Sequence, residues 1–373
     1  MNDPSLRPYR VEVPQADLDD LQERLARVRW PDELADAGWD YGVPLGYVKE
    51  LVEHWRTGFD WRAVEARLNA HEQFTTTIDG ENVYFIHARS PEPDALPLIA
   101  THGWPLSVVD YADLIGPLTD PRAHGADPGE AFHLVIPAMP GFGFSGPTTQ
   151  AGWDMARVAR AWVQLMARLG YERYGAHGND GGSMISPEIG RNDPDRVVGV
   201  HVTQLFSFPS GDPAEFADLS EEDAAALKFL EEFTGRGGLA YNAYQSAQPQ
   251  TLAYALQDSP AGWLAWVTQL FQQAVDRDYI LTNAAMYWLT GTIGSSIRYY
   301  HAEARSPKPT EPTTTPTGVA IFAEDFQSIR RFADRDHANI VHWRHYDRGS
   351  HFSPHDAPEE LVGDIREFFR SLR

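Results

Sequence analysis

Short apolar runs alternate with helical patterns between residues 96 and 205, and this alternation leaves few possible folds. The runs typical of strands cover residues 96–100, 132–145, 173–178 and 197–205, with the second run continuing into a Gly- and Pro-rich loop. Helical patterns separate them at residues 107–121 and 154–170, where Asp154 can cap the second helix and Gly170 can end it. Strands connected in this way run parallel. The sequence therefore predicts an α/β fold, with a mostly parallel sheet and helices on both faces.

The alternation stops after Leu205 and resumes near the end of the chain. From Ser220, which begins a capping box with Asp223, to about Tyr300 the sequence indicates helices. A Pro- and Thr-rich linker follows at residues 303–316, and strands are expected again at 318–322 and 340–346. A helical insertion thus interrupts the sheet. Its aromatic residues include Tyr254, Trp263, Trp266, Phe271 and Trp288.

The first part of the chain has a different pattern. Residues 11–61 read as helical and are rich in Trp, Leu and charge, and residues 74–88 read as a hairpin that turns at Asp79-Gly80. We therefore expect four segments. They are an N-terminal segment at 1–92, the first part of the sheet domain at 93–205, a helical cap at 206–303 and the second part of the sheet domain at 304–373.

The chain contains no cysteine and has a formal net charge of −22 at pH 7. Disulfides, thiol nucleophiles and cysteine metal ligands are therefore excluded. An acidic surface repels phosphate backbones and anionic membranes, so we expect neither nucleic acid nor a membrane as a partner. No apolar run reaches the ~18 residues of a membrane span, and the first residues lack a signal-peptide pattern. We expect a cytoplasmic protein that acts on a neutral small molecule.

Residues 177–183, His-Gly-Asn-Asp-Gly-Gly-Ser, have the form of a nucleophile elbow, a sharp turn from a strand into a helix. Asp180 would be the apex, and the residues two positions away must be small because the strand and helix crowd together there. Gly178 and Gly182 meet this requirement. The start of a helix favours a negative charge, so Asp180 would be an ionised nucleophile. A surface loop rich in turn-forming residues is the alternative interpretation.

Oxyanion donors are expected beside such an elbow. His-Gly-Trp-Pro at residues 102–105 directly follows the strand at 96–100, where a second donor belongs. Pro105 favours an extended Trp104, which helps to aim the Trp104 N–H. The N–H of Gly181 would be the other donor.

An acid and a base should follow the nucleophile in the chain, in that order. Asp325 comes just after the strand at 318–322, and His351 lies in a loop between the last strand and the last helix. We therefore expect Asp325 to orient His351 and His351 to act as the base. Glu324 and Asp347 are alternatives for the acid.

With these residues identified, the chain resembles the epoxide hydrolases of the microsomal type, a family that includes juvenile hormone epoxide hydrolases. The resemblance covers nearly the whole chain and is specific in its N-terminal segment, which most α/β-hydrolases lack. The stretches that carry it are residues 8–69, 101–107, 137–147, 257–266, 282–302, 316–326 and 348–352. The resemblance implies an α/β-hydrolase fold with an N-terminal helical extension and an inserted helical cap.

The resemblance also implies a reaction. Asp180 would be the nucleophile, His351 the base and Asp325 the acid, at a position where the family has Glu or Asp. The product would be a vicinal diol, formed from a hydrophobic, possibly aryl, epoxide and water through an alkyl ester on Asp180. No metal or cofactor is implied.

Two tyrosines of the cap carry over from the family as proton donors. They are Tyr300 in Ser-Ser-Ile-Arg-Tyr-Tyr-His-Ala and Tyr241 in Ala-Tyr-Asn-Ala-Tyr. Tyr299 and Tyr244 lie close to them in the sequence and remain alternatives.

The elbow departs from the family pattern in one respect. The family commonly has Gly-Gly-Asp-Trp-Gly there, whereas this chain has Asn179 before the nucleophile and Gly181 after it. Without a Trp side chain at this position, we expect a more open pocket beside Asp180 and a different substrate range.

Two other functions are compatible with parts of the sequence. A haloalkane dehalogenase also uses an elbow aspartate, but such enzymes usually place a halide-binding Trp after the nucleophile and lack the N-terminal segment. A non-catalytic binding protein would have no need for a complete triad. A homodimer is plausible, and both detoxification and natural-product biosynthesis remain open as roles.

Overall fold

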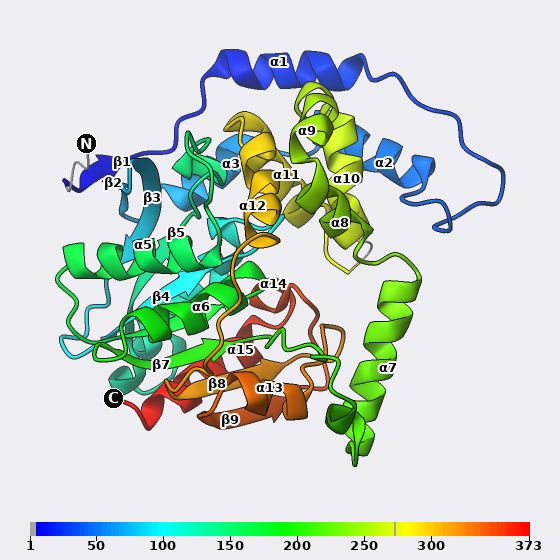
Figure 1. Ribbon diagram of the computed structural model, residues 1–373. Coiled ribbons are helices and arrows are strands. Elements are labelled where there is room, and N and C mark those ends of the chain that lie inside the picture. The colour runs from blue at the N-terminus through cyan, green and yellow to red at the C-terminus, as the bar shows by residue number, and fades with distance from the viewer. Residues whose placement is uncertain (1–4, 272–273) are drawn as a thin grey trace.

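The computed structural model describes residues 5–271 and 274–373; residues 1–4, in the expected N-terminal segment, and 272–273, in the expected cap, lie outside the described residues. Its centre is a nine-stranded sheet with the order β1-β2-β3-β5-β4-β6-β7-β8-β9 (Figure 1). The strands are β1 (Arg7–Tyr9), β2 (Gln73–Ile78), β3 (Glu81–Ala88), β4 (Leu96–Thr101), β5 (Phe132–Pro137), β6 (Tyr174–Gly178), β7 (Val197–Val202), β8 (Thr317–Ile321) and β9 (Ile340–His345). Strands β4 to β9 run parallel. Strands β1, β2 and β3 pair antiparallel in that order, and β3 pairs antiparallel with β5. The predicted mostly parallel sheet is confirmed.

Helices cover both faces of this sheet (Figure 1). They include α4 (Ala112–Thr119) and α15 (Pro358–Arg370) on one face and α5 (Met155–Arg168) and α6 (Gly181–Asn192) on the other. Helix α5 begins where predicted, because the side chain of Asp154 accepts a hydrogen bond from the N–H of Arg157. Its buried stripe of Val158, Trp162 and Leu165 faces the core.

Short helical turns complete the connections. They are the 3-10 turns η1 (Val108–Tyr111), η2 (Pro121–His124), η3 (Pro128–Glu130), η4 (Gly143–Ser145) and η5 (Pro213–Phe216) and the short helices α13 (Arg330–Asp336) and α14 (Ser353–Asp356). The helix expected over residues 107–121 therefore begins as a 3-10 turn and becomes α-helical at Ala112. Among the described residues, none of the helices combines the length and the apolar character that crossing a membrane requires.

Between β7 and β8 the described residues form six helices, in the region where the sequence predicts a helical insertion, and we call them the helical module. They are α7 (Glu221–Gly235), α8 (Ala240–Ala247), α9 (Pro249–Asp258), α10 (Pro260–Phe271), α11 (Arg277–Leu289) and α12 (Ile293–Glu303). Ser220 caps α7 by accepting a hydrogen bond from the N–H of Asp223 at 3.0 Å. Helices α8 to α12 lie together on one side of the sheet, whereas α7 stands apart beside α13 (Figure 1).

The N-terminal segment is helical but is not one continuous helical region. It contains α1 (Gln15–Ala26), α2 (Leu45–Thr57) and α3 (Trp61–Leu68), and residues 28–44 connect α1 to α2 without a helix. Gly38 and Gly42 adopt positive φ values there, which helices exclude. The segment also contributes β1, a strand that the sequence does not predict because it is only three residues long and includes Pro8.

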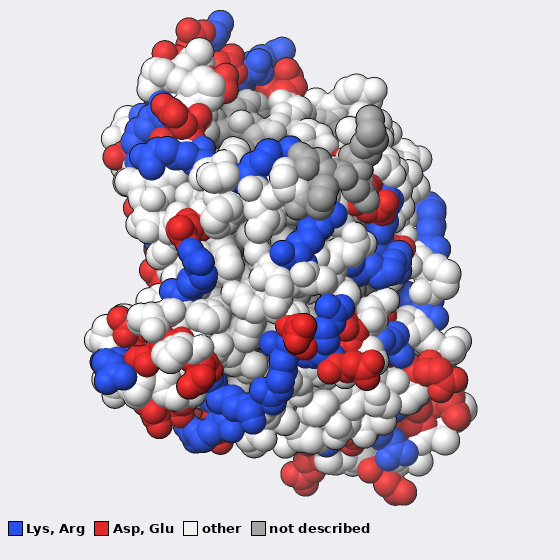
Figure 2. Space-filling model, turned by 90° about the vertical axis from the view of Figure 1, so that its left-hand side faces the viewer, with Lys and Arg blue, Asp and Glu red and all other residues white. Residues whose placement is uncertain are grey.

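The acidic excess of the chain is not apparent on every face. Figure 2 shows the left-hand side of the molecule as drawn in Figure 1, where basic and acidic side chains are interspersed. Ion pairs on the surface of the molecule include Arg157 with Asp79 at 2.7 Å and Arg89 with Glu72 at 2.8 Å.

A buried carboxylate joins α15 to the sheet. Asp364 accepts hydrogen bonds from His201 of β7 at 2.8 Å, from His342 of β9 at 3.0 Å and from the Tyr346 hydroxyl at 2.6 Å. Burial alone would raise the pKa of Asp364, but these hydrogen bonds outweigh it and hold the pKa well below the usual range. The network therefore depends on an ionised Asp364.

We expect Asp364→Ala to lower the free energy of unfolding at pH 7 by about 3–5 kcal/mol, because it leaves buried polar groups without their partner. Glu367→Ala on the same helix is the matched control, and removing its exposed pair with Arg344 should cost less than about 1 kcal/mol. A depressed pKa stabilises the fold above the unfolded-state value of about 3.9, so the difference from the parent should shrink as the pH falls below it. Urea unfolding at several pH values measures both effects, and equal losses in the two variants would contradict the prediction.

Candidate active site

Asp180 is the apex of a sharp turn between β6 and α6, as the elbow pattern predicts. Its backbone has φ 53° and ψ −119°, a conformation that residues other than glycine rarely adopt. A Cβ added at Gly178 would lie 2.0 Å from the Gly182 carbonyl oxygen, and one added at Gly182 would lie 1.8 Å from the Thr101 carbonyl oxygen. Both positions therefore require glycine, and the surface-loop interpretation does not hold.

The carboxylate of Asp180 is held by backbone donors. Its Oδ1 accepts a hydrogen bond from the N–H of Trp104 at 2.8 Å, and the N–H of Gly181 also bonds the carboxylate. Burial opposes ionisation of Asp180, but the hydrogen bond and charge of His351, together with these N–H groups, lower its pKa. Asp180 is thus an anion whose Oδ1 is already held by the N–H of Trp104, with the N–H of Gly181 as a further donor to the carboxylate.

Gly103 lies directly against the same carboxylate, and it is not among the functional residues predicted from the sequence. A Cβ at Gly103 would lie 1.9 Å from Oδ1 of Asp180. The signal that could have identified it is the glycine within His-Gly-Trp-Pro, because a backbone that approaches a reacting group closely tends to require glycine. The Trp104–Pro105 peptide bond that follows is cis.

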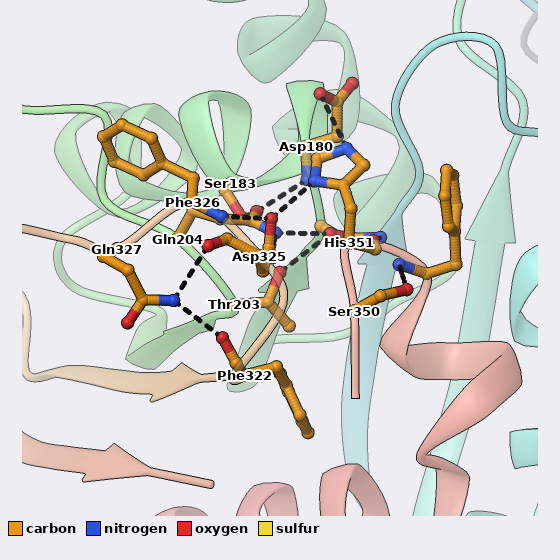
Figure 3. A network of polar contacts seen from close by, with 12 residues as sticks. Asp180, Ser183, Thr203, Gln204, Phe322, Asp325, Phe326, Gln327, Ser350 and His351 are labelled. Atoms are coloured by element: carbon orange, nitrogen blue, oxygen red, sulfur yellow. Dashed lines mark hydrogen bonds and ion pairs between the residues drawn. The ribbon is translucent and has the colours of Figure 1, made fainter. Parts of the chain in front are cut away.

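His351 lies between Asp180 and Asp325 (Figure 3). Its Nε2 is 3.3 Å from Oδ2 of Asp180, and its Nδ1 is 2.8 Å from Oδ1 of Asp325. Asp325 is buried, whereas the alternatives Glu324 and Asp347 are exposed. The structure therefore brings together the three side chains that the chain order suggests, each at the end of a different strand.

The charges around His351 determine its protonation. Burial would lower the pKa of this imidazole, but the carboxylates of Asp325 and Asp180 outweigh burial and raise the pKa well above its usual value. His351 is therefore protonated in the resting site and forms an ion pair with each neighbour. Loss of the charge on either carboxylate would lower this pKa again.

Two buried amides connect these groups, and sequence reasoning missed them as functional residues. Gln204, just after β7, accepts a hydrogen bond from the N–H of Asp180 at 2.9 Å and donates to Asp325 (Figure 3). Asn179 donates to the carbonyl oxygen of His351 at 3.0 Å. The signal available for Gln204 was its place at the end of a parallel strand, where functional residues gather.

Tyr241 of α8 and Tyr300 of α12 face the elbow from the helical module. The Tyr241 ring stacks on Trp104 with a centroid distance of 5.7 Å, and the Tyr300 ring meets the Trp104 ring edge-on at 5.6 Å. Burial and the charge of Asp180 raise the pKa of both hydroxyls, so both carry their proton in the resting site. Tyr244 is 44% exposed, and Tyr299 is buried with its ring against Phe142.

Aromatic side chains of the module divide between the core and the surface. Trp263 is buried and lies edge-on to Trp104 at 6.1 Å, and Phe271 is also buried. Tyr254, by contrast, is 74% exposed and faces solvent. Beside the nucleophile, a Cβ added at Gly181 would meet its nearest atom at 3.5 Å, so there is room for a small side chain.

The arrangement has a definite chemical capability. An anionic carboxylate can attack carbon and become an ester, and N–H donors beside Oδ1 can stabilise the oxyanion that forms when water attacks that ester. An imidazole held by a buried carboxylate can activate the water. Tyrosine hydroxyls opposite the carboxylate can protonate a leaving oxygen.

Comparisons with known proteins agree with this capability. The family model described as "Epoxide hydrolase N terminus" matches residues 6–111. A protein of Stigmatella aurantiaca (strain DW4/3-1) named "Putative epoxide hydrolase" is 40% identical over 99% of this chain and 86% of its own length. Epoxide hydrolase 1 of Sus scrofa is 30% identical over 99% of this chain and 90% of its own length.

A solved structure also matches this chain over its whole length. The crystal structure of juvenile hormone epoxide hydrolase from the silkworm Bombyx mori has a TM-score of 0.90 and 25% sequence identity. The match covers 100% of this chain and 96% of that chain, including the N-terminal segment. The α/β-hydrolase fold expected from the sequence is therefore confirmed.

Proposed function

This chain belongs to the epoxide hydrolases, enzymes that add water to an epoxide, and we propose that it works through a covalent ester on Asp180. The proposed catalytic residues are Asp180, His351, Asp325, Tyr241 and Tyr300, with the N–H groups of Trp104 and Gly181 as the oxyanion hole. The observation that supports this best is that the two oxygens of the Asp180 carboxylate have different partners. Its Oδ1 lies on the Trp104 N–H at 2.8 Å while its Oδ2 remains near His351.

In the first step Oδ2 of Asp180 attacks one carbon of the epoxide ring and the bond between that carbon and the ring oxygen breaks. The ring oxygen gains negative charge and takes a proton from Tyr241 or Tyr300, while the other hydroxyl donates a hydrogen bond to it. The product of this step is an alkyl ester on Asp180, with Oδ1 as its carbonyl oxygen.

Ester formation removes the negative charge of Asp180. One of the two carboxylates that raise the pKa of His351 is then gone, so the pKa falls and the imidazole can release its proton to the tyrosinate or solvent. Neutral His351, oriented by Asp325, can now act as a base. The first step thus prepares the second.

In the second step His351 takes a proton from water, and the oxygen of that water attacks Cγ of Asp180. The negative charge develops on Oδ1, which already accepts a hydrogen bond from the N–H of Trp104; the N–H of Gly181, which also bonds this carboxylate, is the second proposed donor. Collapse of the intermediate breaks the bond between Cγ and Oδ2, and Oδ2 takes the proton held by His351 and leaves as part of the vicinal diol. The water oxygen remains on Cγ and restores the carboxylate of Asp180. A serine at the elbow would instead form an ether, which has no carbonyl group for water to attack.

The substrate class follows from the surroundings of Asp180. The rings of Trp104, Tyr241, Tyr300 and Trp263 contact one another beside it, so we propose a hydrophobic or aryl epoxide as the substrate. Residues 206–303 would act as the cap that supplies most of these rings, between the sheet-domain parts at 93–205 and 304–373. The N-terminal segment at 1–92 would hold this cap in place.

A single turnover in ¹⁸O-labelled water tests the mechanism directly. Because water attacks Cγ of Asp180, one labelled oxygen should remain in the carboxylate, and the peptide that contains residue 180 should be 2 Da heavier by mass spectrometry. An unlabelled peptide, with the label present in the diol, would show that water attacks the epoxide directly and would refute the covalent ester.

We expect Tyr241→Phe and Tyr300→Phe each to slow ester formation by about 10–100-fold, because each removes a hydroxyl that stabilises the departing oxygen. The double variant should be far slower. Tyr244→Phe and Tyr299→Phe, which remove neighbouring hydroxyls, should leave the rate within about twofold. Stopped-flow fluorescence of the tryptophans follows the step, and a normal rate in either single variant would remove that tyrosine from the mechanism.

A further inference from the structure

Asn179 and Gln204 form a buried pair of amides behind the proposed triad. Both side chains are fully buried, and Nε2 of Gln204 donates to Oδ1 of Asn179 at 2.9 Å. We propose that this pair is a positioning unit that holds the acid and the base in the orientation needed for ester hydrolysis. The inference rests on the proposed function, because it assigns the pair to its second step.

The hydrogen-bonding capacity of Gln204 is completely used. Its Oε1 accepts from the N–H of Asp180 and from the hydroxyl of Ser183, both at 2.9 Å. Its Nε2 donates to Asn179 and to Oδ2 of Asp325. An amide can satisfy two acceptor and two donor contacts at once, whereas a carboxylate or an apolar side chain of the same size cannot. These contacts therefore fix which end of the amide faces Asp325.

The contact with Asp325 determines how this carboxylate presents itself to the base. Oδ1 of Asp325 accepts from His351 at 2.8 Å and from the N–H of Phe326 at 2.6 Å, and Oδ2 accepts from Gln204. Asp325 is buried, so an Oδ2 without a donor would be costly. Rotation of the carboxylate to relieve that cost would move Oδ1 away from His351.

Asn179 provides the corresponding link to the base. Its Nδ2 donates to the carbonyl oxygen of His351 at 3.0 Å, and its Oδ1 accepts from Gln204 and from the hydroxyl of Thr203. The pair thus connects the loops after β6, β7, β8 and β9, which carry the nucleophile, Gln204, the acid and the base. Such linked networks act as units, so their members should not contribute independently.

The test is Gln204→Glu, assayed by rapid mixing with styrene oxide. The variant keeps the size of the side chain and an oxygen for the N–H of Asp180, but it places an oxygen instead of an N–H donor against Asp325. We expect hydrolysis of the ester to slow by about 10–100-fold, as for loss of a hydrogen bond to a buried charge. Formation of the ester should stay within about threefold, because it does not require His351 as a base. The ester should therefore accumulate.

Asn179→Ala is the second variant, and Thr203→Val is the matched control. Asn179→Ala removes the link to the His351 carbonyl and should slow hydrolysis by about tenfold while leaving ester formation nearly unchanged. Thr203→Val removes a hydrogen bond to the same Asn179 oxygen, which keeps its contact with Gln204, so both steps should stay within about threefold. The double variant Asn179→Ala/Gln204→Glu should be no slower than the slower single variant.

Each result decides the proposal. Equal slowing of ester formation and hydrolysis in Gln204→Glu, or unchanged hydrolysis, would overturn it. If Gln204→Glu does not fold, Asn179→Ala decides, and slowing of both steps by the same factor would overturn the proposal. The parent protein is measured in the same experiment: absence of an ester there would refute the proposed function itself, whereas a normal ester with unaffected variants would refute the positioning unit alone.

Discussion

Replacing His351 by Gln will give a protein that forms the ester on Asp180 and fails to release it. The nucleophile is an anion in its own right, held by the N–H groups of Trp104 and Gly181, so the first step needs no base. The second step does, and loss of a general base slows such a step by about 10²–10⁴-fold. Intact-mass spectrometry after mixing with an aryl epoxide should show one covalent adduct per chain, with little diol beyond the first turnover.

Three further variants test whether the adduct depends on Asp180 and on the proposed base and acid. Asp325→Asn should also accumulate the adduct, because it removes the charge that orients His351. Asp180→Ala should form none. His355→Gln is the matched control, since His355 lies four residues further along, bonds Asp276 at 2.7 Å and should turn over normally. An adduct in Asp180→Ala, or free turnover in His351→Gln, would contradict the assigned roles.

Gly103→Ala will remove most of the activity although it replaces no functional side chain. The added Cβ would lie 1.9 Å from Oδ1 of Asp180, so we expect the carboxylate to move off its hydrogen bond with the Trp104 N–H by roughly 1 Å or more, to reach an ordinary contact distance. A displacement of this size in a reacting group costs about 100-fold in rate. Both steps should be affected, because the same oxygen orients the attack and later carries the oxyanion. Measured kcat and kcat/KM should therefore fall together.

Gly181→Ala is the matched control. It adds the same methyl group beside the same nucleophile, but the nearest atom, the Cα of Gly103, is 3.5 Å away and the backbone N–H of residue 181 is retained. We expect kcat to stay within about threefold of the parent, since 3.5 Å is an ordinary contact distance. Equal losses in the two variants would show that crowding around Asp180 is not the cause.

Periodicity and chain order were sufficient to predict much of this molecule. The parallel strands, the capped helix after Asp154 and the helical insertion between β7 and β8 all have strong local patterns, and the structure has them at those positions. The relation of Asp180, Asp325 and His351 was also predictable, because the carboxyl ends of parallel strands meet at one edge of a sheet. The strands and helices follow from local patterns, and the meeting of the three side chains follows from the general rule for parallel sheets.

Features that depend on contacts between distant residues were not predictable. Strand β1 exists because Arg7–Tyr9 pairs with β2, far along the chain. Gly103 must be glycine because the Asp180 carboxylate lies against it in the folded protein. The Gln204 amide is identified as functional only by its hydrogen bond to Asp325, 121 residues away. No local pattern in the sequence encodes these distances, so tertiary packing alone reveals them.

The N-terminal segment has a consequence for how the molecule can move. Through β1, β2 and β3 it is part of the sheet, and through α1 and α2 it packs on α10 and α11. Glu50 forms an ion pair with Arg277 at 2.8 Å, and His54 forms a hydrogen bond with Asp278 at 2.6 Å. The α-helices above Asp180 are therefore anchored along their outer side as well as through their two connections to the sheet. A hinged swing of the whole group would have to break those anchors, so admission of an epoxide and escape of a diol must rely on smaller, local displacements of individual helices or loops.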